Sequence, residues 1–593
     1  MILVFGGTTE GRKAVAELEE AGSPFFYSTK TGEQDITLHH GCRVDGAMDE
    51  EAMVQFCQIH DIQLLVDAAH PFAEVLHLTV AKVAEKLNIP AIRFERIFPQ
   101  RDKDINWLDD YSQLSTLNPQ PSSLFSTTGV QSIHKLKPLE AQGVKVFYRI
   151  LPRESSTQLA HQQGATDDQL YYYHEGEDES TILQKLKPDA ILLKESGETG
   201  GFTEKVKVAK ALGIRIYALK RPDTPVIFHC VNGEYGLRRM VEKLLPEFYP
   251  LHSGLTTGTC ATAAAVAATT RLLKGETPPE APVILPNGET ITVPVGYTDG
   301  YAYCTKEAGD DPDVTNGLEI RATVEEAPHF EITAGTGVGR FTLPGFDYPP
   351  GEPAINKAPR QMLRQNLEKL LTPNSKLLTL KVTISVPQGE TIARKTFNPR
   401  LGIEGGISII GVSGIVKPFS EEAFIESIRK CMEVAKASGT RRIVIHSGAK
   451  SEKALQAHYP HLPLQAFVEY GNTIGETLKM AHELSIPRLT LGIMLGKAVK
   501  LAEGHLDTHS KKVVMNKIFI AQMLKETGCT EKDIAKVTDI TLARELWNLI
   551  PQEQIEDFCN VVIRHCVTHC QPLVPQTELT ILLIDDDGTI HSQ

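Results

Sequence analysis

No apolar run in this 593-residue chain approaches the ~20 residues that a transmembrane helix needs, so we expect no membrane-spanning segment and no membrane partner. Basic residues are not in excess, because 61 lysines and arginines stand against 74 aspartates and glutamates and leave a net charge of −13. A general role in binding nucleic acid is therefore not expected. A homo-oligomer is the one macromolecular partner that the sequence leaves open.

Disulfide patterns and targeting signals are also missing. The ten cysteines are scattered without disulfide-like spacing. Residues Met1–Phe5 have the pattern of a strand and lack the basic start and small-residue cleavage site of a signal peptide. A reduced, cytoplasmic location is the simplest expectation.

The chain is too long for one core, and at ~100–200 residues per domain it predicts three to five domains. Its first half alternates short apolar strands with helical stretches, which predicts an α/β fold with parallel sheets. The Pro/Ser/Asn-rich stretch Leu117–Ser123 divides this half, so we expect two Rossmann-like lobes at residues 1–118 and 119–248. The expected strands are Ile2–Phe5, Phe25–Ser28, Leu64–Asp67, Ala91–Phe94, Leu124–Thr127, Val144–Tyr148, Ala190–Leu193 and Arg215–Leu219.

A second half follows the expected junction at Pro246–Pro250. Residues 251–593 mix strand-like stretches with Gly-rich loops and then return to strand–helix alternation, which predicts an α+β half with an α/β portion. The expected strands are Val283–Leu285, Ile291–Val295, Lys381–Val386, Arg442–His446 and Arg488–Leu491.

The chain opens with a glycine turn between a strand and a helix, Gly6-Gly7-Thr8-Thr9-Glu10-Gly11. This context suits a dinucleotide loop, in which Gly6, Gly7, Thr8 and Thr9 would contact the cofactor, and it equally suits a tight turn that caps a helix. The next strand is followed by Ser28, Thr29 and Lys30 rather than by an acid that would hold a ribose 2′-hydroxyl. Hydroxyls and a lysine favour NADPH, with NADH as the alternative.

Three later segments of the first half end strands at the edge where ligands bind in such folds. His70, in Asp67–Ala73, is a candidate to orient substrate or donate a proton, or a structural group that caps its loop. The loop Lys194–Gly201 has the composition of an anion-binding loop, and Leu124–Gly129 is a second strand and glycine turn. Their candidate cofactor contacts are Thr128, Gly129, Ser196, Gly197, Gly200 and Gly201.

Together these segments resemble precorrin-6A reductase, a nicotinamide-dependent enzyme of corrin-ring biosynthesis, over residues 1–245. The match also includes Arg93–Arg96, Arg149–Arg153 and Leu219–Pro222. One departure is Val130, where the family usually places a basic residue. It leaves open a rival interpretation, in which the first half is a non-catalytic module that holds nucleotide or tetrapyrrole.

The second half begins with a Gly/Thr-rich turn that runs into an Ala-rich helix, Gly254-Leu255-Thr256-Thr257-Gly258-Thr259-Cys260-Ala261. This opening resembles cobalt-precorrin-5B C1-methyltransferase, and the resemblance continues to the end of the chain. It includes the acidic loop Gly309–Thr315, the glycine loop Gly335–Arg340 and the segment Asn398–Pro418. The resemblance implies S-adenosylmethionine as methyl donor and a fold that is not the usual Rossmann methyltransferase.

The candidate cofactor contacts of this half are turn hydroxyls, loop carboxylates and glycines that would let the backbone approach a ligand. The alternatives are an Asx turn for the carboxylates and tight packing for the glycines. The candidates are Thr256, Thr257, Gly258, Thr259, Asp310, Asp311, Asp313, Gly335, Gly337 and Gly339.

Thiols and imidazoles of the second half have two interpretations each. Cys260 at a helix start is either a stabilised thiolate or a packing residue, and packing is favoured because methylating an electron-rich ring carbon needs no protein nucleophile. The His/Cys pairs of His565–Cys570 either hold a metal or pack a helix, and no protein-held metal is expected.

The two resemblances imply a bifunctional enzyme of anaerobic cobalamin synthesis, which methylates cobalt-precorrin-5B and then reduces cobalt-precorrin-6A. A broader rival is a generic reductase joined to an unrelated anion-binding protein. Because the cobalt-containing tetrapyrrole substrates are polycarboxylates, basic side chains are candidate substrate clamps, with a surface salt bridge as the alternative for each. They are Arg93, Arg96, Arg149, Arg153, Arg221, Arg340, Arg400 and Lys417.

Overall fold

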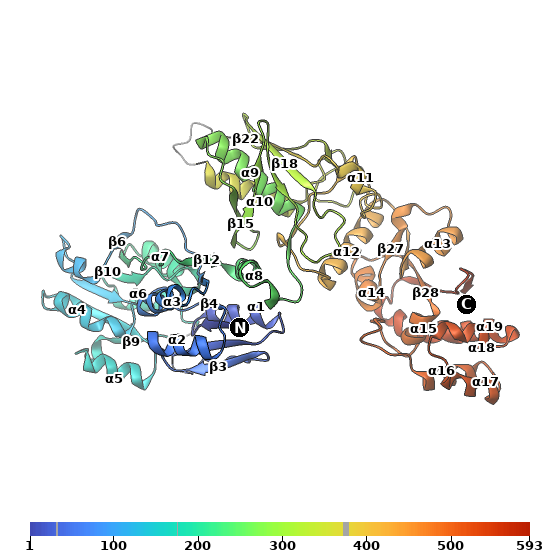
Figure 1. The fold of residues 1–593 in the computed structure, drawn as a ribbon, viewed down its shortest axis with the longest axis horizontal. Helices are drawn as coiled ribbons and strands as arrows, with labels where there is room; N and C mark the ends of the chain where they lie inside the picture. The colour runs from blue at the N-terminus through green and yellow to red at the C-terminus, as the bar shows by residue number, and fades with distance from the viewer. Residues whose placement is uncertain (31, 33, 175, 372–378, 593) are drawn as a thin grey trace. The chain divides into compact units, whose positions relative to one another are not determined.

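The chain forms two compact units in a computed structural model that describes residues 1–30, 32, 34–174, 176–371 and 379–592 (Figure 1). The N-terminal unit comprises Met1–Ser253 with Ile284–Thr292, and the C-terminal unit comprises Gly254–Val283 with Val293–Gln593. Within the described ranges, no helix has both the length and the apolar character to cross a membrane.

The first lobe of the N-terminal unit is a six-stranded sheet in which every neighbouring pair is parallel. Its strands, in spatial order, are β12 (Phe228–Asn232), β5 (Ala91–Glu95), β4 (Leu64–Asp67), β1 (Ile2–Phe5), β2 (Phe25–Thr29) and β3 (Gly41–Asp45). Its helices are α1 (Thr9–Glu19), α2 (Glu50–Ile59), α3 (Glu74–Leu87) and α8 (Gly233–Leu244). Strands β1 and β4 are buried along their whole length, as apolar runs covered on both faces should be.

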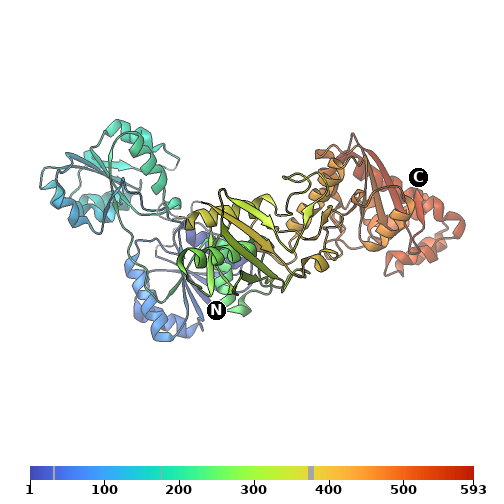
Figure 2. The same ribbon diagram turned by 90° about the horizontal axis from the view of Figure 1, so that it is seen from above.

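The second lobe is another six-stranded parallel sheet. Figure 2 shows the two lobes as separate sheets, the first in blue and the second in cyan to turquoise. The strands, in spatial order, are β6 (Asn106–Leu108), β11 (Arg215–Leu219), β10 (Ala190–Lys194), β7 (Ser123–Ser126), β8 (Lys145–Ile150) and β9 (Leu170–Tyr172). The helices are α4 (Ile133–Glu140), α5 (Glu154–Gln162), α6 (Glu179–Leu186) and α7 (Phe202–Ala211).

The lobes exchange strands along the chain. β6 lies before Leu117–Ser123 yet pairs with β11 in the second sheet, and β12 returns from the second lobe to pair with β5 in the first. This pairing differs from the expected division at residues 118 and 119. The physical reason is that β6 and β12 are edge strands, whose partners are set by the whole sheet and not by local sequence.

The glycine turn after β1 is shaped by close packing. A Cβ atom at Gly6 would lie 2.2 Å from the hydroxyl oxygen of Tyr27, so no larger residue fits there without displacing Tyr27. The Gly7 N–H donates to that hydroxyl at 3.0 Å. Thr8 then caps α1, because its side-chain oxygen accepts the Gly11 N–H at 3.1 Å.

In the C-terminal unit, α9 (Thr257–Lys274) packs on a five-stranded sheet, and α10 (Lys357–Leu370) packs against α9. Neighbouring strands of this sheet are antiparallel except for one parallel pair, β19 with β22. The order is β16 (Gly296–Tyr297), β17 (Ala302–Thr305), β18 (Glu319–Glu326), β22 (Leu380–Ser385) and β19 (Glu331–Ala334).

A second sheet of this unit carries its α/β portion, which Figure 1 shows in orange to red. Four strands are parallel and the last is antiparallel, in the order β27 (Phe467–Glu469), β26 (Arg442–His446), β28 (Arg488–Met494), β29 (Glu578–Ile584) and β30 (Ile590–Ser592). Helices α12 (Glu421–Ala437) to α19 (Ile555–Cys570) accompany it. The expected fold class is confirmed: two parallel α/β lobes precede an α+β half with an α/β portion, and no single large parallel sheet of the usual Rossmann methyltransferase is formed by the described residues of the C-terminal unit.

Candidate active site

A cavity of about 250 Å³ lies in the N-terminal unit, at the carboxyl ends of strands from both lobes. β4 ends just before the loop that carries His70, and β7 and β10 end beside the other lining residues. This edge is where ligands bind in open parallel sheets. The lining residues are His70, Thr127, Thr128, Gly129, Leu193, Lys194, Ser196, Gly200, Phe202 and Lys205.

The imidazole of His70 is held as a neutral group. Its Nδ1 accepts the Phe72 N–H at 3.2 Å, which leaves the proton of the neutral ring on Nε2. Burial lowers the pKa of His70 to about 4, and the charges of Arg96 and Lys194 act in the same direction. His70 can therefore donate a hydrogen bond from Nε2 at neutral pH, but it does not hold a second proton there.

A buried ion-pair network fixes the loop that carries His70. Arg93 donates to Asp67 Oδ1 at 2.8 Å and to the carbonyl of Ala69 at 3.0 Å, and His77 Nδ1 lies 2.5 Å from Asp67 Oδ2. Burial alone would raise the pKa of Asp67, but the His77 hydrogen bond and the Arg93 charge lower it overall. Arg93 is 1 % exposed, so in this structure it supports the loop and does not face solvent as a substrate clamp would.

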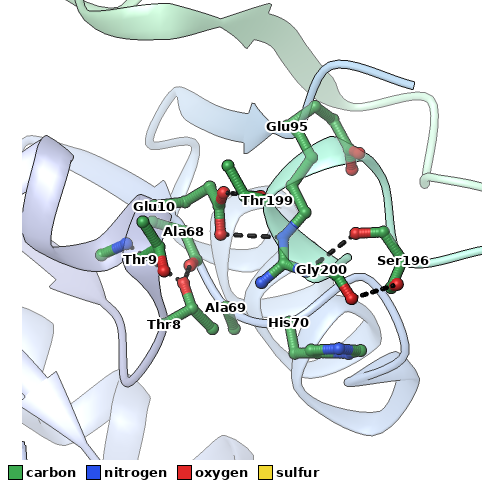
Figure 3. Close-up of polar contacts among 12 residues, drawn as sticks. Thr8, Thr9, Glu10, Ala68, Ala69, His70, Glu95, Ser196, Thr199 and Gly200 are labelled. Atoms are coloured by element: carbon green, nitrogen blue, oxygen red, sulfur yellow. Dashed lines mark hydrogen bonds and ion pairs between the residues drawn. The ribbon is translucent and has the colours of Figure 1, made fainter. Parts of the chain in front are cut away.

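A second network joins the lobes beside the cavity (Figure 3). Arg96 pairs with Glu10 at 2.8 Å and donates to the carbonyl of Ser196 at 2.8 Å. Thr199 donates to the other oxygen of Glu10 at 2.5 Å. Burial would raise the pKa of Glu10, but the Thr199 hydrogen bond and the Arg96 charge lower it overall. Arg96, another predicted clamp, thus has its guanidinium engaged by protein groups on both sides.

Two lysines give the cavity its charge. Burial and the charge of Lys135 lower the pKa of Lys194, whose Nζ lies 5.1 Å from the centre of the Phe72 ring. Lys205 Nζ is 3.6 Å from Glu179 Oε1. With the hydroxyls of Thr127, Thr128 and Ser196, these cations suit a ligand that carries carboxylates or phosphates.

The cavity brings together several predicted site residues from separate parts of the chain. His70, Thr128, Gly129, Ser196 and Gly200 all line it. Gly197 and Gly201 lie in the same loop, both with positive φ, of 75° and 68°. The predicted contacts at the first turn lie next to the His70 loop, because Thr8 donates to the carbonyl of Ala68 at 2.8 Å, although Gly6, Gly7, Thr8 and Thr9 do not line the cavity.

The sequence did not single out the two lysines of the cavity as ligand contacts, nor an acid at the end of β3. Lys194 is the first residue of the predicted anion-binding loop but was not among the candidate contacts, and its position as the last residue of a strand was the available signal; Lys205 lies beyond that loop, in α7. Near the predicted coenzyme contacts, Ser28 is buried and Lys30 is exposed. Thr29 donates to Asp45 at 3.0 Å, and Arg43 also pairs with Asp45 at 3.0 Å.

The three other arginines that were predicted as substrate clamps in the N-terminal unit differ in their surroundings. Arg149 is buried and paired with both Glu177 and Glu179. Arg221 stacks 3.7 Å from the centre of the Phe98 ring. Arg153 is exposed at the start of α5.

The hydroxyls of the Gly/Thr turn in the C-terminal unit form hydrogen bonds with other backbone groups of the same unit. Thr256 caps α9 by accepting the Thr259 N–H at 3.2 Å. Thr257 accepts the N–H of Ile410 at 2.8 Å, and Thr259 donates to the carbonyl of Gly414 at 2.6 Å. Gly258 lies against Pro359, where a Cβ would approach to 2.8 Å. The turn therefore anchors the segment 408–414.

The glycine loop of this unit is a place of close backbone packing. A Cβ at Gly337 would lie 1.8 Å from the carbonyl oxygen of Val386, and one at Gly339 would lie 2.6 Å from Ile403. A Cβ at Gly335 would lie 2.0 Å from the hydroxyl of Ser385. These contacts account for all three glycines through packing, and their predicted contact with a cofactor stays a prediction.

The acidic loop is built around one of its own carboxylates. Asp313 pairs with the buried Lys306 at 2.6 Å and accepts the N–H of Thr315 at 2.7 Å. Asp311 accepts the N–H of Phe419 at 3.0 Å, and Asp310 is exposed.

The basic candidates of the C-terminal unit lie on its loops. Arg400 pairs with Glu452 at 2.7 Å, and Arg340 donates to the carbonyl of Gly351 at 2.9 Å. Lys417 is half-buried beside β25 (Ile415–Val416).

The thiols of interest are buried. Cys260 lies in the covered part of α9, and Cys566 and Cys570 belong to the core beneath α19. No group of three or more His, Cys, Asp or Glu side chains able to hold a metal ion occurs within the described ranges.

The chain matches three families along its length. Residues 1–235 match "Precorrin-6x reductase CbiJ/CobK", residues 246–418 match "CbiD" and residues 507–593 match "CbiD, C-terminal domain". A cobalt-precorrin-5B C(1)-methyltransferase of Prosthecochloris aestuarii is 43% identical over 352 residues, which cover 57% of this chain and 95% of the relative. The chain belongs to the cobalt-precorrin-5B C(1)-methyltransferase family. Its N-terminal part is a precorrin reductase domain joined to that methyltransferase.

Two more relatives of the methyltransferase part are similar to this chain. The cobalt-precorrin-5B C(1)-methyltransferase of Geobacillus kaustophilus is 41% identical and covers 53% of this chain and 87% of its own length. A crystal structure of the cobalamin biosynthesis protein cbiD from Archaeoglobus fulgidus is 30% identical, covering 47% of this chain and 85% of its own, with a TM-score of 0.26. The family matches and the Prosthecochloris relative place the chain in cobalamin biosynthesis, with both a methyltransferase and a reductase domain.

Proposed function

We propose that this chain carries out two consecutive steps on one cobalt-containing tetrapyrrole. Residues 251–593 would transfer a methyl group from S-adenosylmethionine to C1 of cobalt-precorrin-5B, and residues 1–248 would reduce the resulting cobalt-precorrin-6A with NADPH. The observation that carries the proposal is the presence of both family matches on a single chain. Joining two steps that share an intermediate raises the local concentration of that intermediate at the second site.

The cavity of the N-terminal unit fits the reductive step. Its hydroxyls, glycines and two lysines match the phosphates of a dinucleotide and the carboxylates of the substrate. NADPH, when bound, would supply the hydride, and one proton from water must accompany it. We propose that His70 orients the substrate by donating from Nε2, while Lys194 and Lys205 hold its anionic groups.

The C-terminal unit fits methyl transfer that needs alignment and exclusion of water rather than a protein nucleophile. Its buried Cys260 agrees with this chemistry, since the thiol is not presented to a substrate. We propose that the exposed Asp310 and the loop that Asp313 organises border the S-adenosylmethionine site.

A second candidate function keeps the methyltransferase and makes the N-terminal unit a binding module without catalysis. Val130 favours it, because this half-buried side chain packs against the core of the second lobe where the reductase family usually has a basic residue.

Leaving out one cofactor at a time distinguishes the two candidate functions. The whole protein is incubated with cobalt-precorrin-5B, and products are followed by absorption and mass after leaving out S-adenosylmethionine or NADPH. We expect no reaction without S-adenosylmethionine, methylation alone without NADPH, and methylation followed by reduction with both. Methylation that never proceeds to reduction would support the binding-module candidate. No reaction when both cofactors are present would contradict both candidate functions.

A further inference from the structure

The α/β sheet of the C-terminal unit contains a point where its chain direction changes. From β26 the chain passes through α13 (Ala449–His458) to β27 on one side, and from the neighbouring β28 it passes through α15 (Leu495–Ala502) and later helices to β29 on the other. Ligands in open parallel sheets bind outside the carboxyl ends of the strands at such a point. We call the ends of β26, β27 and β28, with the loops that follow them, the carboxyl edge.

His446 ends β26 at this edge with neither ring nitrogen hydrogen-bonded. Its side chain is fully buried, and no bond of normal geometry reaches Nδ1 or Nε2 from the residues that the structure describes. Glu452 Oε2 lies 3.9 Å from Nε2 and instead accepts from Arg400 at 2.7 Å. The Nη1 of Arg400 is also buried without a partner. Because buried polar groups are nearly always hydrogen-bonded, these orphaned groups of two neighbouring residues indicate a missing ligand.

The surroundings of His446 keep its ring neutral. Burial lowers its pKa to about 4, against smaller raising effects of the Glu452 charge and the Gly448 backbone. A neutral imidazole offers one donor and one acceptor to a bound molecule.

The loop after His446 leads into a helix whose N-terminus has no side-chain cap. Gly448, with a φ of +151°, precedes α13. The Ser451 hydroxyl holds this loop by accepting the Ser447 N–H at 3.2 Å and donating to the Gly448 carbonyl at 2.9 Å. The first N–H groups of a helix lack partners within it and attract anionic groups such as a carboxylate.

Glu469 ends β27 beside the same loop. It lies in register with His446, and a Cβ on Gly448 would lie 3.8 Å from Glu469 Oε1. Among the described residues, none forms a hydrogen bond or ion pair with this half-buried carboxylate. In nucleotide-binding βαβ units, an acid at the end of the second strand, about 20 residues after the glycine turn, accepts from ribose hydroxyls. Glu469 occupies that position relative to Gly448.

Lys497 of α15 lies on the β28 side of the edge. Burial lowers its pKa, and the charge of Glu469 opposes this effect, so the two side chains are close enough to interact. The Lys497 ammonium donates to the carbonyl of Gly471, just after β27. Its position leaves the Glu469 carboxylate available to a ligand.

The acidic loop is connected to the same edge through α12. Asp311 accepts the N–H of Phe419, two residues before α12, at 3.0 Å. Phe424 of this helix lies against Gly471, where a Cβ would approach its ring to 3.0 Å. The loop proposed above to border the S-adenosylmethionine site is therefore linked to the end of β27.

Acids and bases are mixed at the carboxyl edge. The acids are Glu452, Glu469 and the turn 585–587 after β29, and the bases are Arg400, Lys450, Lys453 and Lys497. A pyrophosphate or a ring rimmed with carboxylates would meet like charges here. S-adenosylmethionine offers ribose hydroxyls, one carboxylate and two positive groups, and this mixture matches the edge.

We propose that the carboxyl ends of β26 and β27 hold the adenosyl and amino-acid parts of S-adenosylmethionine. This inference rests on the proposed methyltransferase function. Glu469 accepts from the ribose hydroxyls, and the start of α13 and Arg400 donate to the amino-acid carboxylate. His446 gains a hydrogen-bond partner from the ligand, and the two glutamates of the edge favour the positive sulfonium.

The first test titrates S-adenosylhomocysteine into the full chain by calorimetry, so that binding is measured without turnover. Glu469→Gln keeps the size of the side chain and removes its charge. We expect its Kd to rise about tenfold or more, because hydrogen bonds to charged groups are the stronger ones. The Kd of S-adenosylmethionine should rise further, since its sulfonium also loses an opposite charge.

The matched control is Glu326→Gln, which changes an exposed acid at the end of β18, in the other large sheet of this unit, and should leave Kd unchanged. Hydrogen exchange of the wild type is a second measurement that needs no variant. S-adenosylhomocysteine should slow exchange in residues 446–456 and 467–472. Protection found only elsewhere would contradict the inference.

The outcomes distinguish the inference from the function on which it rests. An unchanged Kd in Glu469→Gln, with a wild type that binds and methylates, would overturn the inference while the proposed function stands. A wild type that neither binds S-adenosylhomocysteine nor methylates would overturn the proposed function itself. If Glu469→Gln weakens NADPH and leaves S-adenosylhomocysteine unaffected, the edge binds a dinucleotide and the inference is wrong.

Discussion

Arg96 Nη1 donates a hydrogen bond of 2.8 Å to the main-chain carbonyl of Ser196, so a residue that follows β5 of the first lobe holds the loop that borders the cavity in the second. The same guanidinium pairs with the buried Glu10 at 2.8 Å. Arg96 is therefore one of the links between the lobes that shape the cavity, beside the hydrogen bond from Thr199 to Glu10.

Replacing Arg96 should therefore damage both stability and reduction. Arg96→Ala leaves Glu10 buried without its cation, a loss typically of about 3–5 kcal/mol for a buried pair. We expect a lower unfolding temperature for the N-terminal unit by calorimetry and slower reduction. Lys86→Ala is the control, because the side chains of Lys86 and of its partner Glu50 are both exposed, at 55% and 41%, and pairs of this kind are worth about 0–1 kcal/mol. Equal losses from the two variants would contradict a special role for Arg96.

His70 should matter for reduction alone. His70→Ala removes the Nε2 donor from the cavity, and we expect the reduction rate to fall at least about tenfold while methyl transfer is unchanged. His70→Asn, which keeps an N–H donor, should recover part of the rate. His134→Ala changes an exposed histidine outside the cavity and serves as control. Near-wild-type reduction by a folded His70→Ala protein would make His70 a structural loop residue.

The charge state of His70 gives a pH prediction. Burial places its folded pKa at about 4, below the 6.5 of an ordinary histidine. The unfolded chain binds this proton more tightly than the folded one. The contribution of His70 to the free energy of unfolding is therefore fully present above pH 6.5 and is lost as the pH falls from about 6.5 to about 4. The imidazole NMR signal of His70 should titrate near pH 4, and His70→Asn should lose less stability over that interval. A titration midpoint near 6.5 would show that the ring is not desolvated.

Coenzyme preference is tested at the end of β2. Lys30 is exposed there, so we expect NADPH to bind more tightly than NADH. Lys30→Glu should weaken NADPH binding far more than NADH binding in a fluorescence titration. Lys13→Glu makes the same charge change at an exposed position of α1 and should have little effect. Equal affinities of the wild type for the two coenzymes would refute the preference.

The packing of the glycine loop predicts a large effect of one methyl group. Gly337→Ala places a Cβ 1.8 Å from the Val386 carbonyl oxygen and also strains a φ of +73°. Gly405→Ala has a similar φ of +83° but nothing within 4 Å, so it isolates the strain, about 1–2 kcal/mol. We expect Gly337→Ala to unfold the C-terminal unit at a clearly lower temperature than Gly405→Ala. Equal unfolding temperatures would mean that the loop adjusts freely.

Much of the fold could be predicted because its signals are local. The strands Ile2–Phe5, Leu64–Asp67 and Arg215–Leu219 have the predicted bounds, since each is a short apolar run between turn residues. β3 and β12 escaped prediction because they contain exposed and polar residues and gain their pairing only from the assembled sheet.

The candidate site was predictable only in part, for a similar reason. Loops at strand ends could be recognised, and His70 and Ser196 do line one cavity. The partners of each side chain could not be read from sequence, because they come from distant segments. Arg93 and Arg149 were predicted to bind substrate but are buried in ion pairs with the protein's own carboxylates. The hydroxyl of Thr257, predicted to contact a cofactor, accepts the N–H of Ile410.

The central claim is that one chain performs methyl transfer and reduction in succession on the same tetrapyrrole. The most direct measurement supplies cobalt-precorrin-5B with S-adenosylmethionine labelled in its methyl group and NADPH deuterated at the transferred position, then analyses the product by mass spectrometry. The account predicts that single product molecules carry both the labelled methyl group and the deuterium, and that His70→Ala gives mainly the methyl label. Product that carries the methyl label and never the deuterium, or neither label, would contradict it.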